Sequence, residues 1–85
     1  LNMQASTRLD LRGMTVDDCL IELDLFMDSA IRSGLNEFTI VHGKGTGALK
    51  EEIRRYLRTV PDVATAADEH ADRGGAGITI VTFRQ

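Results

Sequence analysis

Apolar residues in this chain follow helical spacing in some segments and strand spacing in others, and glycines separate these segments. Between Val16 and Ala30 they recur every three or four residues, which predicts an amphipathic helix beginning at Val16. Thr15 can cap that helix, and Gly34 can end it in a left-handed conformation. The apolar face consists of Val16, Cys19, Leu20, Leu23, Phe26, Met27 and Ala30.

Four shorter segments predict strands. Residues 9–11 and 38–41 are rich in apolar, branched or aromatic side chains. Residues 78–83 alternate between polar and apolar side chains and contain β-branched residues, which predicts the final strand. Residues 63–67 predict a short edge strand. If the first two segments are neighbours in a parallel pair, the helix between them completes a β-α-β unit.

A second helix is predicted from Ala48, with apolar residues at helical spacing up to Val60 and Pro61 at its end. Residues 72–77 predict a loop. The element order is therefore β-α-β-α-β-β. We expect an α/β protein, more closely an α+β two-layer sandwich, in which a four-stranded mixed sheet carries both helices on one face.

Length and composition limit what such a chain can be. Eighty-five residues suffice for one modest core, so residues 8–85 are expected to form one domain and residues 1–7 a flexible arm or foreign sequence. The single cysteine, Cys19, lies in the apolar face and is expected in the core. A lone cysteine forms no internal disulfide, and no apolar stretch reaches the roughly 20 residues that span a bilayer. We expect a cytoplasmic protein without membrane contact.

The formal net charge of −3 argues against strong, sequence-independent binding of polyanions. The distribution is uneven, however. Acidic residues concentrate in the first predicted helix, and basic residues follow the predicted loop at residues 42–47. The basic residues of that region are Lys44, Lys50, Arg54, Arg55 and Arg58. One face of an acidic molecule can therefore be basic, although a solvated helix face is the simpler explanation of the arginines.

The segment His-Gly-Lys-Gly-Thr-Gly, residues 42–47, lies between a predicted strand and a predicted helix. Its glycines can turn backbone amides inward, and the helix that follows presents unpaired N–H groups. Lys44 adds a charge and Thr46 a hydroxyl, while Lys50 and Arg54 follow about one and two turns along the helix. This combination predicts a phosphate site. It lacks the lysine of a P-loop and the spacing of a dinucleotide motif, and a simple tight turn is the alternative.

A second candidate is the pair Asp10 and Arg12, which point to one face if residues 9–11 form a strand. Pairing with residues 38–41 would bring them near His42 at the carboxyl edge of the sheet. An imidazole for proton transfer, cations for developing charge and a carboxylate would suit phosphodiester cleavage. An exposed ion pair and a hydrogen-bonded structural histidine are the alternatives.

Three motifs together resemble one known family. Residues 9–13 (LDLRG), 42–50 (HGKGTGALK) and 72–81 (DRGGAGITIV), with their spacing, are similar to the Smr, or small MutS-related, domain over about residues 9–83. Many members have histidine where this chain has Arg12. Arginine there resembles the version at the C-terminus of bacterial MutS paralogues that suppress recombination.

The resemblance implies a fold similar to the C-terminal domain of translation initiation factor three. It also implies a nicking endonuclease domain of a larger MutS-like protein in DNA repair or recombination control, acting on branched, supercoiled or double-stranded DNA. Strong sequence preference is not expected, because the chain shows no helix suited to reading base edges. The alternative is a non-catalytic adaptor that binds RNA or a stalled ribosome. The parent protein is expected to be oligomeric through other domains.

By carry-over from the family, the expected catalytic residues are Asp10, Arg12 and His42. Arginine stays protonated and cannot act as a base, so Arg12 would clamp phosphate. Asp10 would be a proton acceptor or metal contact, and His42 a proton donor. The expected nucleic-acid contacts are Lys44, Gly45, Thr46, Gly47, Lys50, Arg54 and Arg73. No cofactor is certain; Mg²⁺ or Mn²⁺ shared between Asp10 and phosphate stays open.

Overall fold

The computed structural model describes residues 7–85, so the prediction for the N-terminal arm lies outside them apart from Thr7. The elements follow one another as β1 (Arg8–Asp10), α1 (Val16–Arg32), β2 (Glu37–Val41), α2 (Ala48–Leu57), β3 (Val63–Asp68) and β4 (Ile78–Phe83). Two short 3₁₀ helices, η1 (Ala71–Arg73) and η2 (Gly75–Gly77), lie between β3 and β4.

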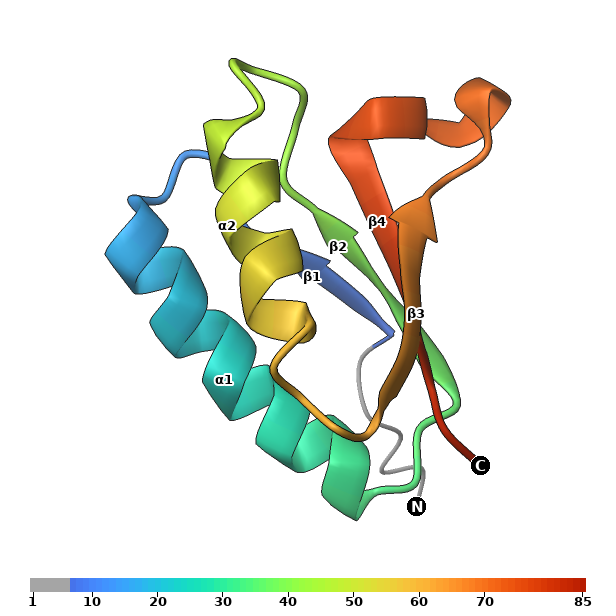
Figure 1. Cartoon of the computed structure of the whole chain (residues 1–85). Coiled ribbons are helices and arrows are strands. Elements are labelled where there is room, and N and C mark those ends of the chain that lie inside the picture. Colours follow the sequence, from blue (N-terminus) through green and yellow to red (C-terminus); the bar gives the residue numbers. More distant parts are fainter. Residues whose placement is uncertain (1–6) are drawn as a thin grey trace, which may run out of the picture.

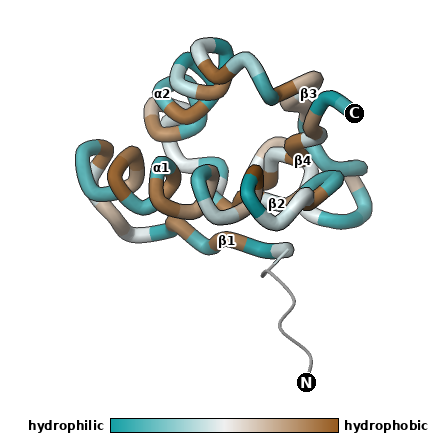
Figure 2. The backbone as a smooth tube through the Cα atoms, turned by 90° about the horizontal axis from the view of Figure 1, so that it is seen from below, coloured by the Kyte–Doolittle hydropathy of each residue, from teal (hydrophilic) through white to brown (hydrophobic). Residues whose placement is uncertain are grey.

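The four strands form one mixed sheet in the order β1-β2-β4-β3. The pair β1 and β2 is parallel, and β4 runs antiparallel to both of its neighbours. Both helices cover the same face of this sheet, as Figures 1 and 2 show from two directions. The predicted two-layer α+β architecture is confirmed, including the edge position of β3.

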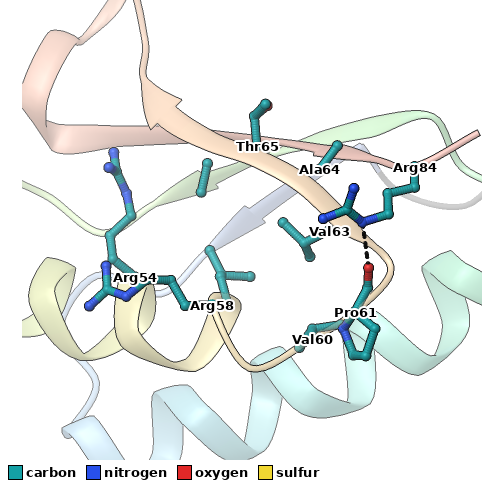
Figure 3. A pocket seen from close by; sticks show the side chains of 10 residues that line it. Arg54, Arg58, Val60, Pro61, Val63, Ala64, Thr65 and Arg84 are labelled. Carbon is teal, nitrogen blue, oxygen red and sulfur yellow. Dashed lines mark hydrogen bonds between the residues drawn. The ribbon is translucent and has the colours of Figure 1, made fainter.

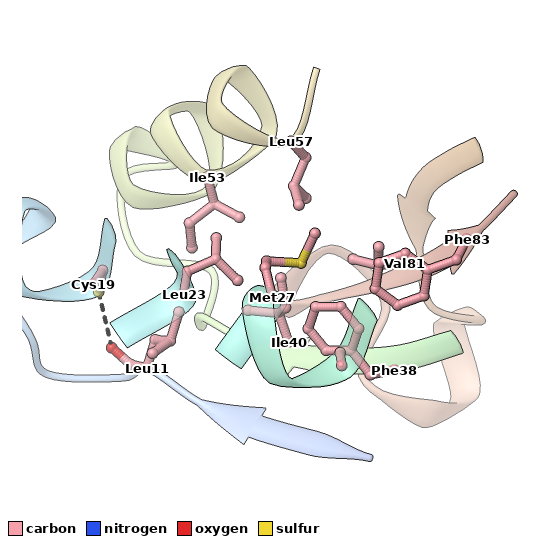
Figure 4. Close-up of a cluster of buried hydrophobic side chains, with 11 residues drawn as sticks. Leu11, Cys19, Leu23, Met27, Phe38, Ile40, Ile53, Leu57, Val81 and Phe83 are labelled. Carbon is pink, nitrogen blue, oxygen red and sulfur yellow. Dashed lines mark hydrogen bonds between the residues drawn. The ribbon is translucent and has the colours of Figure 1, made fainter. Parts of the chain in front are cut away.

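Side chains on the helix-covered face of the sheet meet those of both helices in a single core (Figure 4). Phe38 from β2 stacks on Phe83 with ring centroids 5.8 Å apart. Cys19 is fully buried and its thiol donates to the Leu11 carbonyl at 3.5 Å, while burial raises the pKa of the thiol. Its predicted place in the core is confirmed.

The predicted boundaries of α1 agree with the structure. The Thr15 hydroxyl accepts a hydrogen bond from the Asp18 N–H at 3.1 Å and so caps the helix. Gly34 follows the C-cap with φ +71°, a left-handed conformation that glycine adopts without a Cβ clash. None of the described helices combines the length and the apolar character that a membrane crossing requires.

Other boundaries differ from those predicted, since β2 begins one residue earlier and β3 ends one residue later. β1 lies one residue earlier, and Leu11 is buried just beyond it. α2 ends at Leu57 rather than at Pro61, because the N–H groups of Thr59 and Val60 bond to carbonyls three residues back and tighten the chain into a turn. The loop predicted at residues 72–77 is built largely from the two 3₁₀ turns.

Candidate functional site

The glycine loop, residues 42–47, joins β2 to α2 (Figure 1). Gly43, Gly45 and Gly47 have φ values of +79°, +40° and +86°, a region that other residues rarely adopt. The Gly47 N–H donates to the Lys44 carbonyl at 3.0 Å, and the Thr46 hydroxyl accepts from the Ala48 N–H at 3.3 Å. The loop therefore curls over the N-terminus of α2.

A pocket of about 400 Å³ lies between this loop and the start of α1. Residues 42–50 line one side and residues 14–16 the other, so the N-terminal ends of both helices border it. Helix N-termini favour anions because their N–H groups and dipoles present positive partial charge. Lys44, which is exposed, and Lys50 add formal positive charge. The pocket is thus suited to a phosphate group.

Asp10 and Arg12 form a bidentate ion pair at the end of β1. Arg12 Nε donates to Asp10 Oδ1 at 2.9 Å and Nη2 donates to Oδ2 at 2.6 Å, while the Arg12 backbone N–H reaches Oδ1 at 3.1 Å. These hydrogen bonds lower the pKa of Asp10 to about 2 and raise that of Arg12. Both groups therefore stay charged across the physiological pH range.

This pair lies against the glycine loop. The Leu11 N–H donates to the Val41 carbonyl at 2.8 Å, and a Cβ atom added at Gly43 would lie 3.7 Å from Arg12 Cγ. Neither Asp10 nor Arg12 lines the 400 Å³ pocket, whereas His42 and Lys44 do. The side chains expected to share one cleft thus do not line one pocket together, and Gly43 both lines the pocket and lies next to Arg12.

The His42 side chain is only 6% exposed and both of its ring nitrogens are hydrogen bonded. Nε2 lies 2.7 Å from Thr79 Oγ1, which also accepts a hydrogen bond from Arg54 Nε at 3.1 Å. The Gly43 carbonyl can only accept, so Nδ1 carries a proton and donates it to that carbonyl at 2.8 Å. In the neutral ring Nε2 is then an acceptor, and the Thr79 hydroxyl donates to it. Burial lowers the pKa of His42, with Lys50 and Arg54 adding to the effect, so the neutral form is favoured.

Two of the predicted phosphate contacts are paired within the protein. Asp68 Oδ1 accepts from Lys50 Nζ at 2.7 Å and from Arg54 Nη2 at 2.8 Å, and these contacts lower the pKa of Asp68. Arg73 lies on η1, with its guanidinium exposed and 3.8 Å from Glu69. The structure thus places Lys44, Lys50 and Arg54 at the glycine loop or directly after it, and Arg73 on a separate turn.

The sequence did not single out Thr79, Asp68 or Gly77, which hold this region together. The Gly77 carbonyl accepts hydrogen bonds from the N–H groups of His42 and Gly43, at 3.2 and 2.9 Å. A Cβ atom at Gly77 would lie 3.4 Å from Lys44 Cγ. Of these three residues, only Thr79 could have been noticed in the sequence, because it is a polar residue in phase with the buried positions of the last strand.

The residues present do not form a metal site made by protein ligands alone. Within residues 7–85, no group of three His, Cys, Asp or Glu side chains is arranged to hold a metal ion. Both carboxylate oxygens of Asp10 accept hydrogen bonds from Arg12. A metal contact at Asp10 would therefore compete with that guanidinium.

Comparison with known proteins identifies the family. Residues 9–84 match the family model described as the Smr domain, and the chain belongs to this family. It is 42% identical over 76 residues to a protein of Caldicellulosiruptor bescii named Endonuclease MutS2, and 46% identical over 76 residues to the protein of that name from Solidesulfovibrio magneticus. These alignments cover 89% of this chain but only 10% of either relative, so the chain spans about a tenth of their length.

Two solved structures share the fold. The crystal structure of the Smr domain of Thermus thermophilus MutS2 matches with a TM-score of 0.88 and 41% identity, over 94% of this chain and 100% of that one. YdaL, a stand-alone small MutS-related protein from Escherichia coli, matches with a TM-score of 0.87 and 26% identity, over 93% of this chain and 65% of that one. The same domain fold therefore occurs in a MutS2 protein and in a stand-alone protein.

Proposed function

We propose that this domain binds nucleic acid at its glycine loop and hydrolyses a phosphodiester, acting as the nicking part of a larger MutS2-like protein. One observation carries the proposal: a pocket at two helix N-termini, lined by Lys44 and Lys50, includes Gly43, and the bidentate Asp10–Arg12 pair lies next to that glycine. Relatives that share this domain are named endonucleases. DNA without strong sequence preference is the proposed substrate, in the cytoplasm, in DNA repair or recombination control.

Arg12 is proposed to clamp the phosphate. Its Nε and Nη2 atoms hold Asp10, which leaves Nη1 for a phosphate oxygen. Asp10, with a pKa of about 2, is a weak base at neutral pH. We therefore favour Asp10 as the group that orients Arg12, or contacts Mg²⁺ or Mn²⁺ together with the phosphate, over Asp10 as proton acceptor.

The role proposed for His42 is proton donor to the leaving oxygen. The neutral imidazole holds its proton on Nδ1, which points at the Gly43 carbonyl. Donation therefore requires the imidazole first to take up a second proton, and then to turn away from that carbonyl when substrate occupies the loop. Without such a turn, His42 acts by fixing the conformation of Gly43.

A second function is favoured by the same hydrogen bonds. With both nitrogens of His42 engaged and Asp10 tied to Arg12, the site can hold a phosphate without breaking a bond. The domain would then be a non-catalytic adaptor for RNA, a ribosome or DNA. Turnover, rather than binding, separates this function from the first.

The test is a nicking assay on supercoiled DNA and on a structured RNA, with Mg²⁺, Mn²⁺ or chelator. Asp10→Asn, Arg12→Gln and His42→Asn would be compared with Asp28→Asn, which removes a matched exposed ion pair with Arg32 on α1. We expect losses on the order of 100-fold or more at the three site residues and none in the control. Binding without product from the unmodified domain under every condition would establish the adaptor instead.

A further inference from the structure

A second pocket, of about 310 Å³, lies between the end of α2 and the edge strand β3 (Figure 3). Three arginines line it, and none of the lining residues is acidic, although the chain has 13 acidic and 10 basic residues. Arg54 and Arg58 extend from α2 at one end, and Arg84, which follows β4, lies at the other end. The pocket is therefore a local concentration of positive charge in an acidic domain.

The charges at this pocket are largely uncompensated. Arg84 Nε donates to the Pro61 carbonyl at 2.8 Å, a neutral partner that positions the guanidinium without cancelling its charge. Within residues 7–85, neither Arg58 nor Arg84 forms an ion pair. Arg54 differs, because Asp68 neutralises it. A ligand at this pocket would thus meet two available guanidinium groups.

Between the arginines the pocket wall is apolar. Leu57, Val60, Pro61 and Val63 contribute to it, together with the small residues Ala64 and Ala66 of the edge strand. Among the strands of residues 7–85, β3 pairs only with β4, so its outer edge keeps backbone N–H and C=O groups that have no partner strand there. An aromatic ring with hydrogen-bonding atoms at its edge could pack on this apolar wall and bond to the polar groups beside it.

Three basic residues lie between the glycine loop and this pocket. Lys50, Arg54 and Arg58, the C-cap of α2, are four residues apart, so they follow one face of the helix at intervals of about 6 Å, and Asp68 pairs with the first two. Lys50 lines the loop pocket, Arg54 and Arg58 line the second one. A strand held at the glycine loop can therefore run along α2 and reach the second pocket.

From this continuity we infer that the pocket between α2 and β3 binds one unpaired nucleotide of the nucleic-acid strand held at the glycine loop. The phosphates on its two sides contact Arg58 at one end and Arg84 at the other, and its base lies on the apolar wall between them. The nucleotide is unpaired because a base inside a duplex is stacked and cannot enter a pocket. An acidic peptide would satisfy the arginines but would leave the continuity with the loop unexplained. The inference rests on the proposed nucleic-acid binding.

The experiment measures binding of two fluorescent probes to the chain at fixed salt, an oligothymidylate and a blunt duplex of two complementary strands without unpaired nucleotides. Arg58→Gln combined with Arg84→Gln is expected to weaken oligothymidylate binding about tenfold or more, from lost charge-assisted hydrogen bonds, and duplex binding far less. Arg55→Gln is the matched control, because Arg55 lies on α2 but outside the pocket.

A second pair of variants keeps all arginines. Ala64→Glu introduces a carboxylate at a residue that lines the pocket, whereas Ala67→Glu introduces one on the same strand at a residue that does not. Only the first is expected to weaken oligothymidylate binding. Urea unfolding of every variant shows whether folding is retained.

The outcomes separate this inference from the proposed function. If neither probe binds to the unmodified chain, both fail. If the chain binds and nicks DNA but the pocket variants bind both probes as before, the inference alone fails. If a short polyglutamate peptide displaces the oligothymidylate at equal concentration and shows the same dependence on Arg58 and Arg84, the pocket is a peptide site and the inference is wrong.

Discussion

The Thr79 hydroxyl donates a hydrogen bond to His42 Nε2 over 2.7 Å while it accepts one from Arg54 Nε. Thr79 is completely buried, so water cannot replace it in either contact. The Gly43 carbonyl places the proton of the neutral ring on Nδ1, and the Thr79 hydroxyl satisfies Nε2 and links the imidazole to the basic face of α2. A residue of the last strand thereby completes the hydrogen bonding of the buried imidazole.

Thr79→Val is therefore expected to cost about 1–3 kcal/mol of unfolding free energy, because a buried acceptor and a guanidinium N–H lose their partner. Urea unfolding measures this loss. Nitrogen NMR shifts of the His42 ring should show that Nε2 has lost its hydrogen bond while Nδ1 keeps the proton. Thr82→Val, which removes a hydroxyl that pairs with Thr65 on the other face of the sheet, is the control and should leave the ring unchanged.

Stability should fall with acidification through the range in which an ordinary histidine titrates. The pKa of His42 is lowered in the folded state, so below an ordinary value near 6.5 the unfolded chain takes up a proton that the folded chain resists. The stabilisation is complete above that value and is lost as the pH falls towards the folded pKa. Urea unfolding between pH 8 and 5 measures the slope, and His42→Gln should reduce it. An unchanged slope in the variant would contradict the assignment.

Arg12→Lys should raise the pKa of Asp10 from about 2 towards 3.8, because lysine cannot reproduce the two-pronged contact of the guanidinium. Carbon NMR titration of the Asp10 carboxyl group measures the change. Nicking should fall as well, on the order of 100-fold, if the Arg12 guanidinium also holds the phosphate. Arg32→Lys on α1 is the control, and it should change neither quantity.

Asp68→Asn should strengthen nucleic-acid binding. The carboxylate holds both Lys50 and Arg54, and its removal frees two cations beside the glycine loop. We expect affinity to rise about tenfold at low salt, and the slope of log affinity against log salt to steepen by about 1 to 2. Fluorescence anisotropy over a salt series measures both. Asp72→Asn, on the exposed turn η1, should show no comparable steepening.

Gly77→Val should displace the glycine loop. Even a Cβ at this position would lie 3.4 Å from Lys44 Cγ and 3.5 Å from the Gly43 backbone, so a larger side chain must push the loop away. We expect a stability loss of about 1–3 kcal/mol from overpacking, together with weaker nucleic-acid binding. Ala76→Val, at the exposed neighbouring position, is the control. Equal binding by both variants would show that the loop tolerates the displacement.

Much of the fold could be predicted from the sequence because the apolar spacing is regular. Helical spacing, a threonine cap and a terminal glycine predicted α1 correctly. The alternation and β-branched residues of positions 78–83 predicted β4. The end of α2 was wrong because Val60 continues the apolar spacing and still packs against the core, although the chain has already left the helix at Leu57. Side-chain periodicity does not report backbone hydrogen bonding.

The site was predictable in its parts but not in its arrangement. Alternation in the first strand indicated that Asp10 and Arg12 share a face, and the structure pairs them. The orientation of His42 was not predictable, because it depends on Thr79, which is 37 residues away in the sequence. Asp68 was equally hidden, since its contacts to α2 exist only once β3 lies beside β4.

The junction between the glycine loop and the closing loop is made by backbone atoms, with the Gly77 carbonyl receiving two successive N–H groups of the glycine loop. Exchange of side chains at Lys44 or Thr46 does not remove these bonds. Side chains of the loop can therefore be substituted one at a time while its backbone stays attached to the sheet. The same loop conformation can thus present different functional groups.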